Sequence, residues 1–209
     1  MKLHTELLTE SLWKLLLQLM QEPALGDFYL VGGTALALLL GHRSSHDLDL
    51  FTNRSFNPES LLNHLSRHFP TERIATEEDT VRLEIGGIKV EMMADLHALL
   101  DPLLTLQGVR MASLKDLAAF KLNAISGRGL RRDFIDLAAL LDLFSLQEII
   151  GFFRQKYAQN NVWHLVKALG YYDNADQDQI PLDLKNGQSW QQVKSKVQAH
   201  LQSYLEENT

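Results

Sequence analysis

Hydrophobic positions recur with two different spacings along the chain, and the change falls near residue 112. Before that point short apolar runs and alternation predominate, which is typical of strands, although residues 3–21 and 58–69 show helical spacing. From Ser113 onward the helical spacing continues to the end. We therefore predict an α+β fold with two domains. An α/β domain over 1–112 holds a mixed sheet flanked by helices, and a helical bundle occupies 113–209.

The most informative stretch of the front half is residues 29–51, YLVGGTALALLLGHRSSHDLDLF. A short apolar run ends at Gly32-Gly33, a helix-forming run follows over 34–40, and residues 47–51 alternate charged and apolar. This order predicts strand, glycine turn, helix, polar loop and strand.

A second pattern of alternation predicts a β-hairpin. Residues 71–85 and 88–93 flank Gly86-Gly87, a dipeptide suited to a two-residue turn. Residues 108–112 suggest a short final strand.

The back half predicts five helices, with Ser113 as an N-cap and Asp116 at the position of a capping-box acid. They are expected over 113–126, 130–143, 146–157, 161–172 and 190–205, with a polar loop over 173–187.

Composition narrows the class of protein. The chain has no cysteine, so disulfides and thiolate metal sites are excluded. Its N-terminus lacks the apolar core of a signal peptide, and its most apolar run, over 34–40, is too short to span a bilayer. These features predict a cytoplasmic protein without a membrane partner.

Charge argues against a general nucleic-acid coat, because the net charge is −6. Acids outnumber bases over 1–112, whereas the two balance over 113–209. Residues 117–132 carry four bases and no acid, so any RNA contact is expected there. Those bases are Lys121, Arg128, Arg131 and Arg132.

Asp47 and Asp49 lie two apart on a predicted strand, so both side chains would share one face. Neighbouring carboxylates raise each other's pKa, and a bound Mg²⁺ relieves this because it prefers hard oxygen ligands. The alternative is a solvated strand end, and for the Asp-x-Asp pair alone that alternative is favoured.

The glycine turn before this pair predicts an anion site. Gly32 and Gly33 allow close approach of a phosphate, and the helix that begins near Thr34 offers free N–H groups. Ser45 could add a hydroxyl and Arg43 a charge. Taken singly, each residue is better explained as part of an ordinary turn or loop.

Glu91 is a candidate third carboxylate, as a metal ligand or as a general base. A surface acid on an edge strand is an equal alternative, since Glu84 on the neighbouring strand is just as acidic.

Lys121 and Asp136 both fall within apolar stripes of their predicted helices. A buried charge is costly unless it is paired, so we expect the two side chains to meet where the two halves join. The pair could be a structural salt bridge, or Lys121 could hold a triphosphate while Asp136 orients it.

His64 and His68 have the i,i+4 spacing of a zinc pair. No third ligand accompanies them along the sequence, so metal binding is not the favoured interpretation.

Together these motifs resemble the polymerase-β-like nucleotidyltransferase fold, and more specifically the AbiEii/AbiGii toxin family, over about residues 27–200. The resemblance rests on Gly32-Gly33-Thr34, on Ser45, Asp47 and Asp49, on residues 112–117, on Lys121, on residues 129–137 with Asp133 and Asp136, on residues 170–173, and on Trp190.

The resemblance implies transfer of NMP from an NTP with release of pyrophosphate, by a toxin or phage-defence protein that can have a cognate antitoxin. It implies that Asp47 and Asp49, with Glu91 as third acid, hold Mg²⁺, two ions in all. Lys121 with Asp133 or Asp136 would complete the site, and Gly33 and Ser45 would contact phosphates.

The acceptor implied is RNA, such as a tRNA end, bound by Arg128, Arg131 and Arg132. Arg132 replaces the family's usual lysine, a change that keeps charge but not geometry. Two alternatives remain: a nucleotide-binding module that acts through a protein partner, and transfer to a small molecule or a protein.

Overall fold

A seven-stranded mixed sheet forms the front half of the computed structural model, which describes residues 2–178, 184 and 187–208. The strand order is β3-β4-β5-β2-β1-β7-β6. Pairs β2/β5 and β1/β7 are parallel, and the other neighbours are antiparallel. The strands are β1 (Tyr29–Val31), β2 (Leu48–Thr52), β3 (Thr71–Glu77), β4 (Thr80–Ile85), β5 (Ile88–Ala94), β6 (Leu104–Leu106) and β7 (Val109–Met111).

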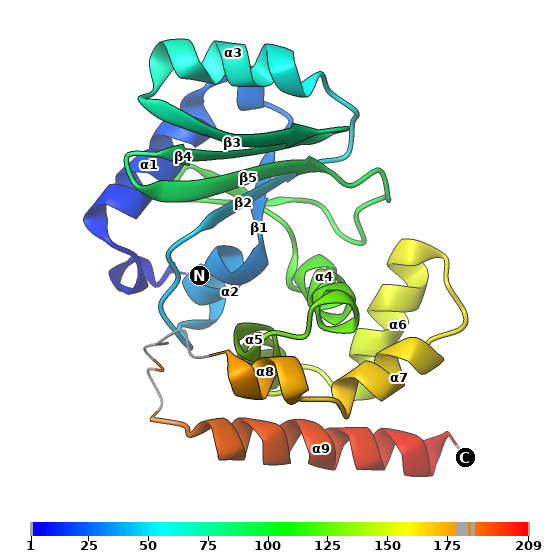
Figure 1. The fold of residues 1–209 in the computed structure, drawn as a ribbon. Helices are drawn as coiled ribbons and strands as arrows, with labels where there is room; N and C mark the ends of the chain where they lie inside the picture. Colours follow the sequence, from blue (N-terminus) through cyan, green and yellow to red (C-terminus); the bar gives the residue numbers. More distant parts are fainter. Residues whose placement is uncertain (1, 179–183, 185–186, 209) are drawn as a thin grey trace.

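Helices flank the sheet and make up the back half, as Figure 1 shows. In this view the sheet lies above α4 to α9, and α2 lies between the two parts. The α-helices are α1 (Glu10–Gln21), α2 (Gly32–Leu40), α3 (Pro58–His68), α4 (Leu114–Gly127), α5 (Arg131–Leu140), α6 (Leu146–Tyr157), α7 (Trp163–Leu169), α8 (Asp173–Gln177) and α9 (Trp190–Glu207), with 3₁₀ turns η1 (Thr5–Leu7) and η2 (Pro23–Leu25). This architecture confirms the predicted α+β class.

The central strands explain how the sheet presents a polar edge. Every residue of β1 is buried, whereas β2 alternates, with Leu48 and Leu50 in the core and Asp49 half-buried. A strand exposes every second side chain on the same face, so β2 contributes its leucines to the core and turns Asp49 away from it.

The predicted hairpin around Gly86-Gly87 is present, with Ile85 opposite Ile88. The first predicted arm, however, is two strands rather than one, because a turn at Glu78–Asp79 separates β3 from β4. Asp79 adopts a φ of 51° there and receives a hydrogen bond from the Phe56 N–H.

The predicted strand over 108–112 is present as β7, and it pairs with β6, a strand that was not predicted from the sequence. The predicted helix over 161–172 is shorter, as α7, because a break at residues 170–172 precedes α8. Of the predicted polar loop over 173–187, the first part is α8, and residues 179–183 and 185–186 lie outside the described residues.

One cluster of buried apolar side chains runs through both halves of the chain. The expected domain boundary at 112 falls between β7 and α4, where the Ser113 hydroxyl caps α4 by accepting the Asp116 N–H. The Asp116 carboxylate does not close a capping box. It accepts from the Leu100 N–H and pairs with buried Lys156 of α6.

Within the described ranges, every helix is too short or too polar to cross a membrane.

Candidate active site

The glycine turn is tight because two charged side chains occupy the space beside it. Gly32 has a φ of 69°, and a Cβ there would lie 2.1 Å from Asp49 Oδ2. A Cβ on Gly33 would lie 2.2 Å from Arg43 Nη2. Any larger residue at either position would displace Asp49 or Arg43, so the turn is matched to the site and not only to the chain reversal.

Strand register brings three carboxylates to one region. Asp49 pairs with Val31 of β1 on one side and with Glu91 of β5 on the other. Asp47 directly precedes β2, which begins at Leu48, one residue later than the sequence suggested. Its side chain is 45% exposed and points in the same direction as Asp49, toward a cavity.

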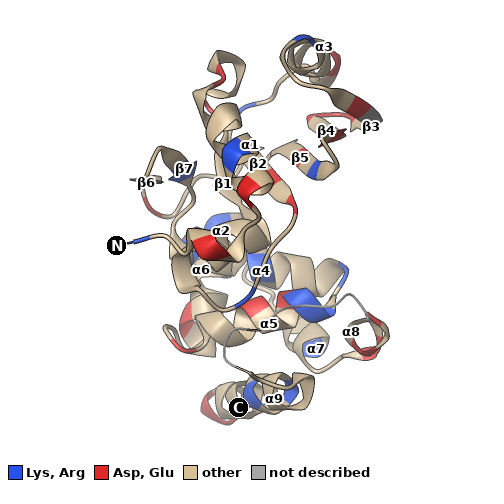
Figure 2. Ribbon diagram, turned by 90° about the vertical axis from the view of Figure 1, so that its left-hand side faces the viewer, with Lys and Arg blue, Asp and Glu red and all other residues tan. Residues whose placement is uncertain are grey.

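This cavity has a volume of about 570 Å³ and is lined by residues of both the sheet and the helical half. Acids from the β2–β5 side and bases from the α4–α5 side contribute to it, and Figure 2 shows both signs of charge on these elements. Its charged lining consists of Arg43, Asp47, Asp49, Arg82, Lys89, Glu91, Lys121, Arg128, Arg132 and Asp133, beside Gly33, Ser45 and His46.

Asp49 is an acid of the cavity whose pKa is raised. Burial, followed by repulsion from Glu91, raises the pKa of Asp49 to about 6, and attraction by Lys121 and Arg128 opposes the rise only in part. A cation beside such a carboxylate would stabilise its ionised form.

Glu91 is held by Arg82, its cross-strand partner in β4. Arg82 Nε donates to Glu91 Oε1 at 2.7 Å, and Arg82 Nη1 donates to Glu77 Oε1 at 2.8 Å. Arg82 therefore competes for Glu91 with any ligand in the cavity.

Thr34 orders the loop that leads into β2. Its hydroxyl donates to the Asp47 carbonyl oxygen at 2.5 Å and lies 2.8 Å from the Ser45 hydroxyl. Thr34 is buried and does not line the cavity, whereas Ser45 does. Thr34 therefore positions Ser45 and Asp47 from behind.

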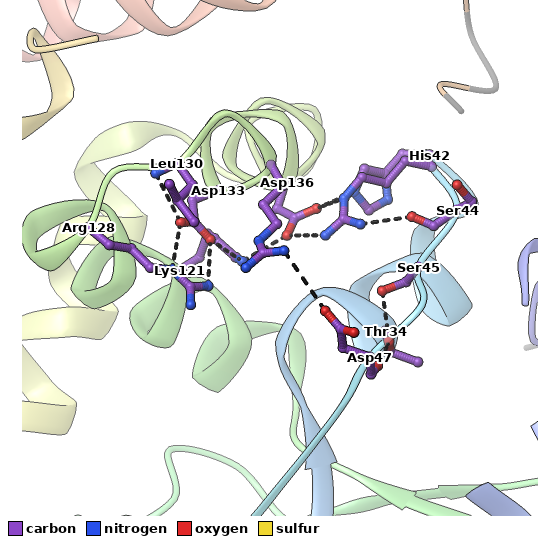
Figure 3. A network of polar contacts seen from close by, with 12 residues as sticks. Thr34, His42, Ser44, Ser45, Asp47, Lys121, Arg128, Leu130, Asp133 and Asp136 are labelled. Atoms are coloured by element: carbon purple, nitrogen blue, oxygen red, sulfur yellow. Dashed lines mark hydrogen bonds and ion pairs between the residues drawn. The ribbon is translucent and has the colours of Figure 1, made fainter. Parts of the chain in front are cut away.

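Asp136 joins the two halves of the chain beneath the cavity (Figure 3). Arg43 donates to its two oxygens at 2.6 and 2.9 Å, His42 Nε2 donates at 2.7 Å, and Lys121 Nζ lies 2.7 Å away. Burial opposes the charged form, but Arg43 and Lys121, with His42, hold the pKa of Asp136 well below its usual range. Asp136 is fully buried and is not part of the cavity lining, so it acts on Lys121 and Arg43.

Asp133 is one helical turn away and does line the cavity. It accepts from Lys121 Nζ at 3.1 Å and from Arg128 at 3.0 and 3.1 Å. Burial opposes its charged form, yet Lys121 and Arg128 lower its pKa. Lys121, only 4% exposed, thus has its ammonium group fixed between two carboxylates at the cavity wall.

The three arginines expected to hold an acceptor have different surroundings. Arg128 and Arg132 line the cavity, and Arg132 Nη1 lies 3.9 Å from Asp47 Oδ2. Arg131 points elsewhere, because its guanidinium donates to the carbonyls of Ala175 and Asp176 and lies over the Trp190 ring. Arg131 therefore fastens α5 to α8 and α9.

The donor set of the cavity fits Mg²⁺, since Asp47, Asp49 and Glu91 offer only carboxylate oxygens. Gly32 leaves room for the Asp49 carboxylate, and the raised pKa of Asp49 favours a cation beside it. With Glu91 turned to Arg82, the three do not converge on one point. Asp47 and Asp49 would therefore be the first ligands of such an ion, and Glu91 would join them in competition with Arg82.

Four polar residues at the site had not been predicted: Arg82 and His42, which pair with its carboxylates, and His46 and Lys89 of the lining. Arg82 could have been found, because counting outward from the Gly86-Gly87 turn places it opposite Glu91. His42 carries no such signal, since only the fold brings it to Asp136.

Comparisons with known proteins identify relatives along nearly the whole chain. The sequence model of the family described as "Nucleotidyl transferase AbiEii toxin, Type IV TA system" matches residues 14–209. An uncharacterized protein of Aquifex aeolicus (strain VF5) is 31% identical over 189 residues, which cover 86% of this chain and 89% of that one.

Solved structures share the fold at low identity. JHP933 from Helicobacter pylori is 17% identical with a TM-score of 0.54, and the likeness covers 96% of both chains. The nucleotidyltransferase toxin MenT4 from Mycobacterium tuberculosis H37Rv is 17% identical with a TM-score of 0.52, over 92% of this chain and 82% of that one.

Proposed function

The chain belongs to the AbiEii toxin family of nucleotidyltransferases, and from this premise we propose a specific reaction. The protein transfers NMP from an NTP to an acceptor hydroxyl on RNA, such as a tRNA end, in a Mg²⁺-dependent reaction with two ions. Because the family belongs to type IV toxin–antitoxin systems, the protein is proposed to act as a toxin or phage-defence component with a cognate antitoxin.

The observation that carries the proposal is that three carboxylates on one wall of the cavity lie opposite bases on the other wall. Asp47, Asp49 and Glu91 come from the sheet side, beside Arg82 and Lys89, and Lys121 and Arg128 come from the helical side, beside Asp133. A triphosphate needs metal ligands on one side and fixed cations for its outer phosphates on the other. A volume of about 570 Å³ falls within the usual range of small-ligand sites.

Each residue then has a defined task. Asp47 and Asp49, with Glu91, would hold Mg²⁺, which supplies positive charge to the phosphates when it is bound. Lys121, oriented by Asp133 and Asp136, would bind the β- and γ-phosphates from the opposite wall.

The glycine turn and the Ser45 hydroxyl would bind phosphate oxygens at the start of α2. Gly33 and Ser45 line the cavity, whereas Gly32 and Thr34 support it from behind. Arg43 donates from Nε and Nη2 to Asp136 and from Nη1 to the Ser44 carbonyl oxygen, so it contributes charge to the floor of the cavity rather than a free donor.

In the transfer, the acceptor oxygen forms a bond to the α-phosphorus while the bond to the bridging oxygen of the β-phosphate breaks, and pyrophosphate leaves. Once it is free of Arg82, Glu91 would accept the proton of the attacking hydroxyl. Arg128 and Arg132 at the rim would bind acceptor phosphates.

The test is transfer from each labelled NTP to total RNA, protein or metabolites, with Mg²⁺ present. We expect RNA to be labelled by the wild type and by the control variant Glu84→Gln. Glu84 lies on the same hairpin as Glu91 but does not line the cavity. Asp49→Asn should lose at least about 100-fold in rate, as expected when a central electrostatic contact is removed.

Undiminished labelling by Asp49→Asn would contradict the mechanism. Labelling of metabolites or protein in place of RNA would overturn the acceptor assignment alone. Tight NTP binding without transfer to any acceptor would instead support a binding module that acts through a partner.

A further inference from the structure

A second group of metal-binding side chains lies away from the cavity, at the junction of α1 and α3. Among the described residues, Glu22, His64 and His68 form a group whose ligand atoms all lie within 4.8 Å of one another. None of the three lines the cavity. The sequence showed the His64–His68 spacing but not its third member, because Glu22 is 42 residues away along the chain.

The local structure explains how the three side chains meet. His64 and His68 lie on successive turns of α3, and their ring centroids are 4.5 Å apart. Glu22 is the C-cap of α1 and the N-cap of η2, and its Oε1 lies 2.8 Å from His64 Nε2. Two helix ends therefore hold the donors together.

The hydrogen bonding of the histidines suits metal ligation. His68 Nδ1 lies 3.0 Å from the His64 carbonyl oxygen, which can only accept, so this nitrogen carries the proton. Its Nε2 then keeps a free lone pair, as in metal-bound histidines whose other ring nitrogen donates to a carbonyl. His64 Nε2 and Glu22 Oε1 share a proton in their short hydrogen bond, and a metal ion can take the place of that proton.

Access and spacing are also suitable. The Glu22 side chain is 12% exposed and the His64 side chain 38%, so an ion can enter from solvent. Tetrahedral zinc with bonds of about 2.0–2.1 Å separates its ligand atoms by about 3.3 Å, which small rotations of these side chains reach.

We propose that Glu22, His64 and His68 form a zinc site that ties the end of α1 to the last turn of α3. Two imidazoles and one carboxylate form an established zinc ligand set that leaves a fourth position for water or another donor. Imidazole nitrogens suit zinc and disfavour Mg²⁺, so the two sites of the chain would take different ions. The site is independent of the proposed transferase mechanism.

The experiment uses untagged, metal-stripped protein in excess Mg²⁺, which occupies carboxylate sites. Co²⁺ is titrated while its visible absorption is recorded, and Zn²⁺ is then added as competitor. We expect one equivalent of Co²⁺ to bind with the strong absorption of a low-coordinate site and to be displaced by Zn²⁺. Zn²⁺ should also raise the thermal midpoint of the protein.

The variants separate this site from the other histidines of the chain. His68→Ala and Glu22→Gln should each weaken zinc binding by at least about tenfold. His200→Ala, a histidine of α9 outside the group, should bind zinc as the wild type does. Because His68 is exposed, its replacement should leave the fold and nucleotidyl transfer unchanged.

Equal zinc affinity in wild type and His68→Ala would overturn the proposal, as would the absence of binding to the wild type. Neither result bears on the transferase function, which is measured separately by NMP transfer.

Discussion

Burial and the neighbouring carboxylate of Glu91 in β5 make the negative charge of Asp49 unfavourable, and Lys121 and Arg128 offset this only in part. An ionised carboxylate in this position destabilises the cation-free protein, whereas a bound cation would stabilise it. Such a conflict between stability and function is common at functional sites.

We expect metal affinity to follow the ionisation of Asp49. Its pKa of about 6 means that Mn²⁺ or Mg²⁺ affinity should rise with pH up to about pH 6 and level off above it, because only the ionised carboxylate is a ligand. Titration of Mn²⁺ binding against pH measures this. An affinity that stays constant between pH 5 and 7 would contradict the assignment.

The same shift affects stability without metal. Between the unfolded pKa of 3.8 and the folded pKa of about 6, the folded protein holds more protons, so its free energy of unfolding should fall as pH rises through this interval. Asp49→Asn removes this pH dependence and should stabilise the metal-free protein at pH 7 by about 1 kcal/mol. This figure is smaller than the full pKa shift implies, because the side chain is partly exposed to solvent. Added Mg²⁺ should then raise the thermal midpoint of the wild type only.

At the scale of elements, α4 and α5 are joined to the loop after α2 by buried charges. Lys121 comes from α4, Asp136 from α5, and Arg43 from the loop. Another buried pair, Lys156 with Asp116, joins α6 to α4 in the same way. An intact buried ion pair adds little to the free energy of unfolding, but removal of one partner lowers it strongly because the other charge stays buried and unpaired.

Asp136→Asn is therefore expected to lower the free energy of unfolding by about 3–5 kcal/mol, because Arg43 and Lys121 would remain buried without their counterion. Chemical denaturation at neutral pH measures the loss. The control is Asp142→Asn, whose exposed pair with Lys196 should change stability by less than about 1 kcal/mol. Equal effects of the two substitutions would show that the buried pair is not a structural link.

The elements that the sequence predicted well are those with an unambiguous period or turn. The hairpin at Gly86-Gly87 and the helices α4 to α6 were predicted with the correct type. The turn between β3 and β4 was missed because it has no glycine, and Asp79 takes the positive φ instead.

Within the site, the predictable residues are likewise those that stand out from a periodic pattern. A charge in an apolar stripe marked Lys121 and Asp136, and the structure places them 2.7 Å apart. His42 and the direction of Arg131 depend on contacts between distant segments, which periodicity does not encode.

At the scale of the whole molecule, a net charge of −6 surrounds a cavity whose helical wall is basic. An anionic polymer is therefore attracted only locally, and its binding should depend on few residues. Arg132 is the best placed of these, since its nearest acid among the described residues, Asp47, is 3.9 Å away, whereas Arg128 donates to Asp133 at 3.0 Å.

Arg132→Ala should weaken RNA binding and lower the slope of log affinity against log salt by about one. Filter binding over a range of salt concentrations measures the slope. Arg67→Ala, an exposed arginine of α3, is the control and should leave it unchanged. A slope that is unaffected by Arg132→Ala would place the acceptor elsewhere.

The buried carboxylate of Asp136 also limits how this protein can be recombined. Its partners come from both halves of the chain, His42 and Arg43 from one and Lys121 from the other. A hybrid that takes residues 113–209 from a relative would have to inherit matching charges on both sides of the junction, or it would bury an unpaired ion. The two halves are therefore expected to change together, as one inherited unit.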